Sequence, residues 1–497
     1  MKHCALCVLA ALALTAVYGG GRKEATVGPE LFNAELSGTI TVSAYETLMY
    51  RSILEDAARS FQALHPGTTV KVETFSAMPV IRLIEQDGTT IVQVESHGDS
   101  QGQADYISRV STAQMSGQGA DVYAMDVLPL HKFAAGGQFE NLDAYMDADP
   151  GFNRADYREN ILDALKYRGG VWFLPTDYNF TYLAYDSTLV PAALSAGFGT
   201  NKAWTTGELL AIAERYYDGS AKLFNLVDYS PGGGLAHQIL YENIENYVDL
   251  TNKRVDFLSG GFTRFLELIR RVGERGYVPR GTTRGEHTEI RLPQAGEETE
   301  RFFFKLRNNF SLVSYFLEKT ARRMMMGSAD ALGDIDDDDG IAGMAAVAGA
   351  VAGGGAVTGG ARVPFTYKQA YGISSGSKNK ALAWAFIKFL VAGEAQRSSS
   401  LANSGLPLNN GAREQKARLL FETLEKDGAL SAGMEAALQG YIAVTEELSD
   451  QINYFQVRDS IVNDMITGEL YSFFTGAKTA AQVAAILQNE VDLYLNE

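Results

Sequence analysis

The sequence predicts an α/β protein of two lobes, and three observations carry that prediction. The chain has 497 residues, which is more than a single hydrophobic core usually organises. Near its start, strand and helix patterns alternate, as is typical of a parallel sheet. In its centre, residues 168–186 place strand-like runs on both sides of Pro175, which suggests a chain that leaves one sheet and enters another.

The first elements form a βαβ pattern. Residues 39–44 alternate apolar and polar side chains, which predicts a strand. Residues 53–64 place apolar side chains at helical spacing, and Val70 and Val72 begin another alternating strand. This order predicts parallel strands joined by a right-handed crossover. Ligands bind beyond the carboxyl ends of strands in such sheets, and the loop 45–49 lies at one.

The following stretch gives weaker patterns. Residues 76–119 are expected to be a polar connection with a helix near 105–115, and residues 121–125 the next strand. Further helices are expected at 204–215, 235–244, 262–272 and 301–317. Short strands are expected at 324–326 and 370–373, the latter followed by a helix with Leu382, Ala385, Phe386 and Phe389 on one face. The tail is expected to be helical, with a capping box at Thr479 to Gln482.

The central stretch, RGGVWFLPTDYNFTYLAYD, is the candidate floor of a ligand cleft. Residues 171–174 and 181–185 are rich in β-branched and aromatic side chains and predict two strands. Between them lies a polar break at Asp177 and Asn179, with aromatic residues on both sides. A polar break of this kind between two lobes suits a ligand. An ordinary β-turn with buried aromatics explains the same residues.

Composition and charge exclude several classes of protein. With 46% apolar and 21% charged residues, the chain has an ordinary soluble composition. Its formal net charge of -17, without a basic stripe, argues against binding of nucleic acid or of an anionic membrane surface.

The amino-terminal residues predict export. MKHCALCVLAALALTAVYGGG has a positive Lys2, an apolar run and a small-residue cleavage site, so residues 1–19 are expected to be a signal peptide. As a membrane anchor the run is too short to span easily. Cys4 and Cys7 both lie inside it, so the mature chain is expected to have no disulfide, thiol nucleophile or cysteine metal site. The Ala/Gly-rich run 341–361 is expected to be a loop or loose strand rather than a span.

The sequence contains residues that could suggest a calcium loop, a hydrolase nucleophile or a histidine metal site, but none of the three patterns is complete. The acidic run 334–339 lacks the Gly and Glu that a calcium-binding EF-hand loop requires. The G-x-S-x-G pattern at 372–376 would need a later histidine, but none follows His287. The other histidines lack metal-ligand spacing. We therefore expect no catalytic residues, no metal site and no cofactor, and predict that the protein is not an enzyme.

Five segments together resemble the extracellular solute-binding proteins of bacterial ABC transporters, in the family that includes maltose-binding protein. They are SGTITVSA with ILEDAARSFQALHPGTTVKVETF; GADVYAMDVLPLHKFAAGGQFENLD; YRGGVWFLPTDYNFTYLAYDSTLV; QAYGISSGSKNKALAWAFIKFLVAGEAQ with GLPLNN; and ELYSFFTGAKTAAQVAAILQNEVDLYLNE. They occur in the expected order over nearly the whole mature chain. Each segment alone is a weak signal, and the five together are specific for this family.

The resemblance implies a periplasmic-binding-protein-like fold of type II, with two α/β lobes joined by several hinge crossings. It places the crossings near residues 175–181, 368–371 and 408–413. Lobe 1 would comprise residues 36–175 plus 371–409, and lobe 2 residues 176–370 plus 410–497. The break at Pro175 predicts the first of these crossings independently.

The resemblance also implies a set of ligand-binding residues. Carried over by position, they are Tyr45, Glu46, Asp126, Asp177, Tyr178, Asn179, Tyr229, Tyr454 and Phe455. These residue types suit a sugar, because carboxylates and amides bond hydroxyl groups and aromatic rings stack on the apolar face of a pyranose. Two of them have a purely structural alternative: Phe455 as a core residue and Glu46 as a helix cap.

The expected function is capture of a sugar or oligosaccharide between the lobes and its delivery to ABC permease subunits by an exported monomer, periplasmic or associated with the cell surface. The alternatives are a peptide or polyamine bound by the same fold, and an exported carbohydrate-active enzyme. Two departures from the family bear on this. The sequence Gly327-Ser328-Ala329-Asp330 lacks the aromatic that relatives often carry there, and Tyr18-Gly19-Gly20 stands where a lipid-anchored relative has a cysteine. A soluble periplasmic protein is therefore expected.

Overall fold

The structure is a computed structural model of the whole chain, and the part of it described here is as follows. Described are residues 27–32, 35–46, 50–75, 80–86, 89–95, 100–186, 222–225, 240, 244–274, 302–308, 321–325, 362–396, 405–426 and 434–497. Several predictions fall outside this part: the signal peptide, the helix at 204–215, most of that at 235–244, the acidic run 334–339, the Ala/Gly-rich run 341–361 and Tyr229.

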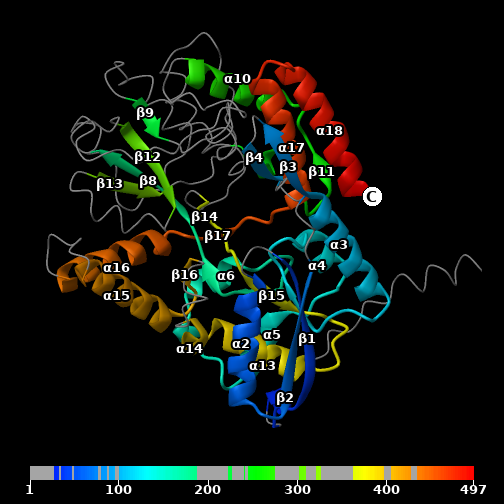
Figure 1. Ribbon diagram of the computed structural model, residues 1–497, viewed down its shortest axis with the longest axis vertical. Helices are drawn as coiled ribbons and strands as arrows, with labels where there is room; N and C mark the ends of the chain where they lie inside the picture. The colour runs from blue at the N-terminus through cyan, green and yellow to red at the C-terminus, as the bar shows by residue number, and fades with distance from the viewer. Residues whose placement is uncertain are drawn as a thin grey trace, which may run out of the picture.

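The first sheet has five strands in the order β2-β1-β5-β15-β6. These strands are β1 (Gly38–Tyr45), β2 (Thr68–Phe75), β5 (Val122–Ala124), β6 (Leu174–Pro175) and β15 (Ala370–Ile373). Strand β1 runs parallel to β2 and β5, whereas β15 is antiparallel to β5 and β6. The helix α2 (Tyr50–Leu64) connects β1 to β2, so the predicted βαβ unit is confirmed. Figure 1 shows this sheet in the lower half of the molecule.

Apolar side chains on α2 and α13 bind these helices to the first sheet. The core side of β1 is fully buried at Ile40, Val42 and Ala44. Helix α13 (Lys380–Val391) packs beside α2, and the rings of Phe61 and Phe386 meet edge to face with centroids 5.3 Å apart. We call the large cluster that these residues belong to the first core.

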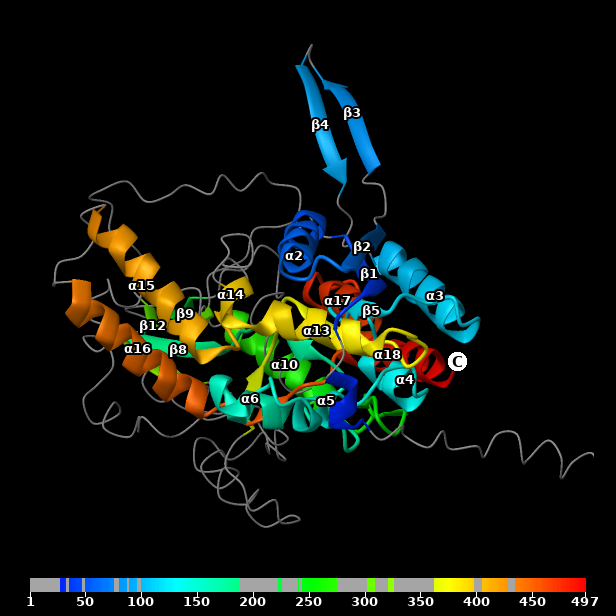
Figure 2. The same ribbon diagram turned by 90° about the horizontal axis from the view of Figure 1, so that it is seen from below.

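A β-hairpin that the sequence analysis missed lies between β2 and α3. Its strands are β3 (Val80–Gln86) and β4 (Thr89–Glu95), and α3 spans Ser100–Met115. In Figure 2 the hairpin projects from the body beside β2 and α2. The expectation of a polar connection was wrong because Asp87-Gly88 separates two runs rich in Ile and Val, which is a hairpin signal.

The second sheet has the order β13-β8-β12-β9. Its strands are β8 (Thr181–Asp186), β9 (Lys222–Asn225), β12 (Phe302–Asn308) and β13 (Ala321–Met325), with β8 antiparallel to both of its neighbours. The helix expected at 301–317 is wrong over 302–308, where β12 forms. Three consecutive phenylalanines begin that strand, and an apolar run of this kind fits a strand as well as a buried helix.

Three helices supply most of what we call the second core, which also contains Tyr247, Val248 and Phe257. The helices are α10 (Gly261–Glu274), α17 (Ser460–Phe474) and α18 (Ala480–Asn496). The capping box is confirmed, since Thr479 and Gln482 exchange side-chain and backbone hydrogen bonds at the start of α18. None of the helices in the described ranges is long and apolar enough to cross a membrane.

Short pairings lie where the chain passes between the two sheets. After β6 the chain forms β7 (Asp177–Tyr178), which pairs with β16 (Leu406–Pro407), and then enters β8. Strand β14 (Pro364–Phe365) pairs with β17 (Tyr454–Phe455) just before the chain enters β15. Strand β6 is shorter than the predicted run 171–174, because the backbone of Val171 bonds to Asn141 and Leu142 instead of a neighbouring strand.

Two long helices and several short elements complete the described fold. Helices α15 (Asn410–Lys426) and α16 (Met434–Asp450) pack together and contribute Phe421, Leu438 and Tyr441 to the first core. The short elements are η1 (Pro29–Phe32), α4 (Leu130–Ala135), α5 (Leu142–Ala148), η2 (Arg154–Asp156), α6 (Glu159–Ala164), η3 (Ile244–Asn246), β10 (Val248–Asp249), β11 (Arg254–Val255) and α14 (Gly393–Gln396).

Candidate functional site

Three of the predicted site residues lie in the passage between the sheets, and all three are buried. The backbone of Asn179 exchanges hydrogen bonds of 2.7 Å with Thr366 in both directions. Tyr178 donates its hydroxyl to Ser449 Oγ on α16 at 3.1 Å and stacks on Phe180. Asp177 accepts the backbone N–H of Lys368 at 2.9 Å. These contacts tie the passage together, and contact of these residues with a ligand stays a prediction.

A half-buried lysine lies near Asp177. Lys416 on α15 donates to the carbonyl of Gly405 at 2.6 Å. Burial lowers the pKa of Lys416 to about 8, and the negative charge of Asp177 opposes this shift. The carboxylate of Asp177 therefore stabilises an ammonium that water does not fully solvate.

The structure brings Tyr45, Glu46 and Asp126 to one edge of the first sheet, at the carboxyl ends of β1 and β5. The ring of Tyr45 is 3% exposed and packs against Tyr106, with centroids 5.7 Å apart. Glu46 donates its N–H to the carbonyl of Phe75 and accepts from the N–H of Arg51 at the start of α2. Burial raises the pKa of Tyr106, and the nearby charge of Asp126 adds to this shift.

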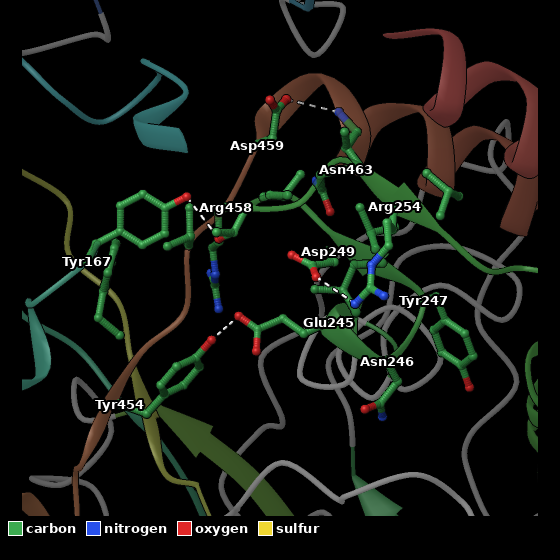
Figure 3. A pocket seen from close by; sticks show the side chains of 18 of the residues that line it. Tyr167, Glu245, Asn246, Tyr247, Asp249, Arg254, Tyr454, Arg458, Asp459 and Asn463 are labelled. Carbon is green, nitrogen blue, oxygen red and sulfur yellow. Dashed lines mark hydrogen bonds and ion pairs between the residues drawn. The ribbon is translucent and has the colours of Figure 1, made fainter. Parts of the chain in front are cut away.

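A pocket of about 740 Å³ lies between the first and second cores. It is lined by Tyr167 from the segment after α6, by residues of η3, β10 and β11, and by the chain from β17 into α17. Of the nine predicted site residues, Tyr454 and Phe455 line it. Figure 3 shows Tyr454 facing Glu245 across part of this pocket, with Asp249 and Arg254 close by.

Tyr454 is held by an acid and a base that the sequence analysis did not select. Its hydroxyl donates to the carboxylate of Glu245, and the guanidinium of Arg362 lies 3.7 Å from the centre of its ring. Arg362 also bonds Glu245 at 2.7 Å. Burial raises the pKa of Glu245, and Arg362 opposes this shift. The ring is thereby fixed at the wall of the pocket.

Other polar groups at the pocket wall are paired as well. Asp249 accepts from Arg254 at 3.2 Å and from Asn252, and the hydroxyls of Tyr167 and Thr251 lie 2.9 Å apart. Ionic groups that already neutralise each other, interleaved with hydroxyls and rings, suit a polar ligand without net charge. Phe455 is 8% exposed and packs against Phe173, Phe365 and Tyr367, so it supports the wall from within the first core.

No local sequence signal marked Glu245, Asp249, Arg362 or Arg458, which come from distant parts of the chain. Within the described residues, no cluster of His, Cys, Asp or Glu is placed to hold a metal ion. The serine of the G-x-S-x-G pattern, Ser374, is 2% exposed and donates to Gln114 at 2.9 Å. It serves as a turn residue between β15 and α13, as expected.

The sequence matches the family of bacterial extracellular solute-binding proteins over residues 85–432. A search of curated proteins finds no match. Similar solved structures include a family 1 extracellular solute-binding protein from Alicyclobacillus acidocaldarius, at 15% identity and a TM-score of 0.53, covering 94% of this chain and 100% of that one.

Two further structures are similar over their length. The sugar-binding protein MalE from Xanthomonas citri has 13% identity and a TM-score of 0.55, covering 92% of this chain and 98% of that one. A putative oligosaccharide periplasmic-binding protein from Synechococcus has 13% identity and a TM-score of 0.52, covering 92% and 99%. The two-lobe α/β fold of type II implied by the resemblance is confirmed.

Proposed function

Since the chain belongs to the bacterial extracellular solute-binding proteins, we propose that it captures a sugar or oligosaccharide between its two lobes and delivers it to the permease of an ABC importer. In this proposal the protein is exported, performs no chemistry on its ligand and acts by closure of one lobe on the other. Affinity then depends on the equilibrium between open and closed arrangements as well as on contacts.

One observation carries the proposal: a pocket of about 740 Å³ lies between two separate cores and has a fixed tyrosine ring in its wall. A volume of this size suits a small ligand such as a mono- or oligosaccharide. The paired charges of Glu245 with Arg362 and of Asp249 with Arg254 support a neutral polyol over an ionic solute. Two of the similar structures, a sugar-binding protein and a putative oligosaccharide periplasmic-binding protein, point the same way.

The proposal is tested by a thermal-shift screen of the full chain against sugars, oligosaccharides, peptides and polyamines. A ligand that binds the folded state raises the unfolding temperature by mass action. We expect a shift with one or more sugars, and that the shift is lost in Tyr454→Ala, measured against that variant's own unliganded baseline. Tyr471→Ala on α17 is the matched control, because Tyr471 is 42% exposed and does not line the pocket.

Two results would redirect the proposal. A shift only with peptides or polyamines would favour a non-sugar receptor of the same fold. Release of smaller sugars on incubation with an oligosaccharide would favour a carbohydrate-active enzyme, because a receptor returns its ligand unchanged.

A further inference from the structure

Helix α4 joins the first core to the second through a buried histidine. Leu130, Phe133 and Ala134 of α4 belong to the first core, whereas α17 and α18 build the second. His131 lies on α4, is 3% exposed and faces Asp459, the N-cap residue of α17. The distance from His131 Nε2 to Asp459 Oδ2 is 3.6 Å, which is too long for a hydrogen bond.

Both carboxylate oxygens of Asp459 already accept hydrogen bonds from α17 and α18. One oxygen accepts from the backbone N–H groups of Ile461 and Val462 at 2.9 and 3.2 Å. The other accepts the hydroxyl of Tyr494 on α18 at 2.9 Å. Its negative charge is thus stabilised by a helix N-terminus and a hydroxyl, without a proton from His131.

His131 itself is poorly stabilised as a cation. Neither ring nitrogen has a hydrogen-bond partner among the described residues. Its charged neighbours have mixed signs: Asp459 favours the protonated form, whereas Lys132, Lys253 and Arg168 oppose it. Lys132 lies 3.7 Å from the ring centre of Tyr494 and donates to that residue's carbonyl, so a second cation occupies the same contact.

We propose that His131 makes the docking of α4 against α17 and α18 depend on pH, so that the two cores are held together near neutral pH and separate more readily in acid. A neutral imidazole fits the buried contact. A protonated one has to leave it for water, because the contact provides no acceptor at hydrogen-bonding distance and already holds Lys132.

The direction follows from proton linkage. Burial lowers the pKa of docked His131 from 6.5 to about 4, with Asp459 opposing the shift. Between these values the separated arrangement binds one more proton than the docked one, so lowering the pH favours separation. The docking equilibrium constant is expected to fall by up to about tenfold per pH unit within this window.

The test measures the distance between the cores by electron spin resonance on a doubly labelled full chain. Labels go on Leu64→Cys at the end of α2 and Tyr471→Cys on α17, which are 57% and 42% exposed, after Cys4 and Cys7 are replaced by serine. We expect the distance distribution to broaden and lengthen as the pH falls from about 6.5 towards 4, and to recover on return to neutral pH. His131→Phe should remove this response.

His65→Gln, outside the contact, is the matched control and should respond as the parent does. A parent distribution that is constant over the window overturns the proposal, as does one that narrows in acid or one that His131→Phe leaves equally sensitive to pH. Should His131→Phe fail to fold, judged by circular dichroism, His131→Gln replaces it, because glutamine is also unable to take up the proton.

Discussion

The contacts of Asp177 give it a structural role in the passage between the two sheets. It is 1% exposed, accepts the N–H of Lys368 and lies near the half-buried ammonium of Lys416. Asp177→Asn keeps an acceptor oxygen but removes the negative charge. We expect it to lower the free energy of unfolding by about 1–3 kcal/mol, discounted from a fully buried pair because Lys416 is only partly buried.

Urea unfolding at neutral pH checks this expectation. The control is Asp163→Asn, whose carboxylate is 57% exposed and pairs with the exposed Lys166, so its effect should stay within about 0.5 kcal/mol. Equal unfolding midpoints for the two variants would show that Asp177 has no structural role.

Gly405 gives a second residue-scale prediction. It adopts φ +143°, and a Cβ there would lie 2.8 Å from the side-chain amide of Asn179. Gly405→Ala should therefore destabilise the protein by about 1–3 kcal/mol through strain and a shifted Asn179. Gly468→Ala should instead be neutral or stabilise by up to about 1 kcal/mol, because Gly468 lies in α17 with open space around it. Thermal unfolding of both variants tests this. Equal unfolding temperatures would contradict a role for the close approach of Gly405 to Asn179.

Residue-scale features were predictable from sequence where the interaction is local. The capping box joins Thr479 to Gln482, three positions later, and the sequence pattern identified it. The acid that holds Tyr454, Glu245, lies 209 residues away in the chain, and Arg362 lies 117 residues from Glu245. Periodicity and propensity carry no information about such pairs, so the sequence could nominate Tyr454 but not its partners.

At the scale of elements, the capping box at the start of α18 allows the stabilisation by a single helix cap to be measured. Thr479→Ala removes the side-chain oxygen that accepts the N–H of Gln482 at 3.3 Å. The expected cost is about 0.5–2 kcal/mol of unfolding free energy. Thr467→Ala in α17 is the control. Thr467 is exposed and its hydroxyl donates to the carbonyl one turn earlier, so the loss of that hydroxyl should be nearly neutral. Denaturant unfolding monitored by circular dichroism measures both, and equal midpoints would contradict a role for the cap.

Elements were predicted well where one periodicity dominates and poorly where two compete. Strand β1 and helix α2 have a single clear pattern and formed within a few residues of their expected bounds. Helix α13 formed around the apolar residues from which it was expected. Strand β12 begins with three phenylalanines that fit both a buried helix and a strand. Its pairing with β8 decided the outcome: Phe304 lies opposite Tyr185, 119 residues earlier, and Leu306 lies opposite Leu183, 123 residues earlier. Such pairing is a tertiary effect that overrides local preference.

At the scale of the whole molecule, the chain passes between two sheets and packs two separate cores. The passage after Pro175 was predictable, because proline has no N–H to donate to a ladder and strand-like runs flank it on both sides. The pairing of β7 with β16 was not, since it joins segments more than 200 residues apart. The two cores are not the same as the two predicted lobes, because the first core also takes Tyr178, Phe365 and Phe421 from the residues assigned to lobe 2. The division into lobes stays a prediction.

A ligand held between the cores has to stabilise both of them. The pocket takes Tyr167 from the first core and Tyr247 and Val462 from the second. At a ligand concentration of roughly 100 times Kd, the folded state should gain about 2.7 kcal/mol. Hydrogen exchange followed by mass spectrometry should then show slower exchange in α13 and in α18 alike. Tyr454→Ala should show neither change at the same ligand concentration. Protection confined to α18 would place the ligand within one lobe, and closure of the lobes on it would then be the wrong mechanism.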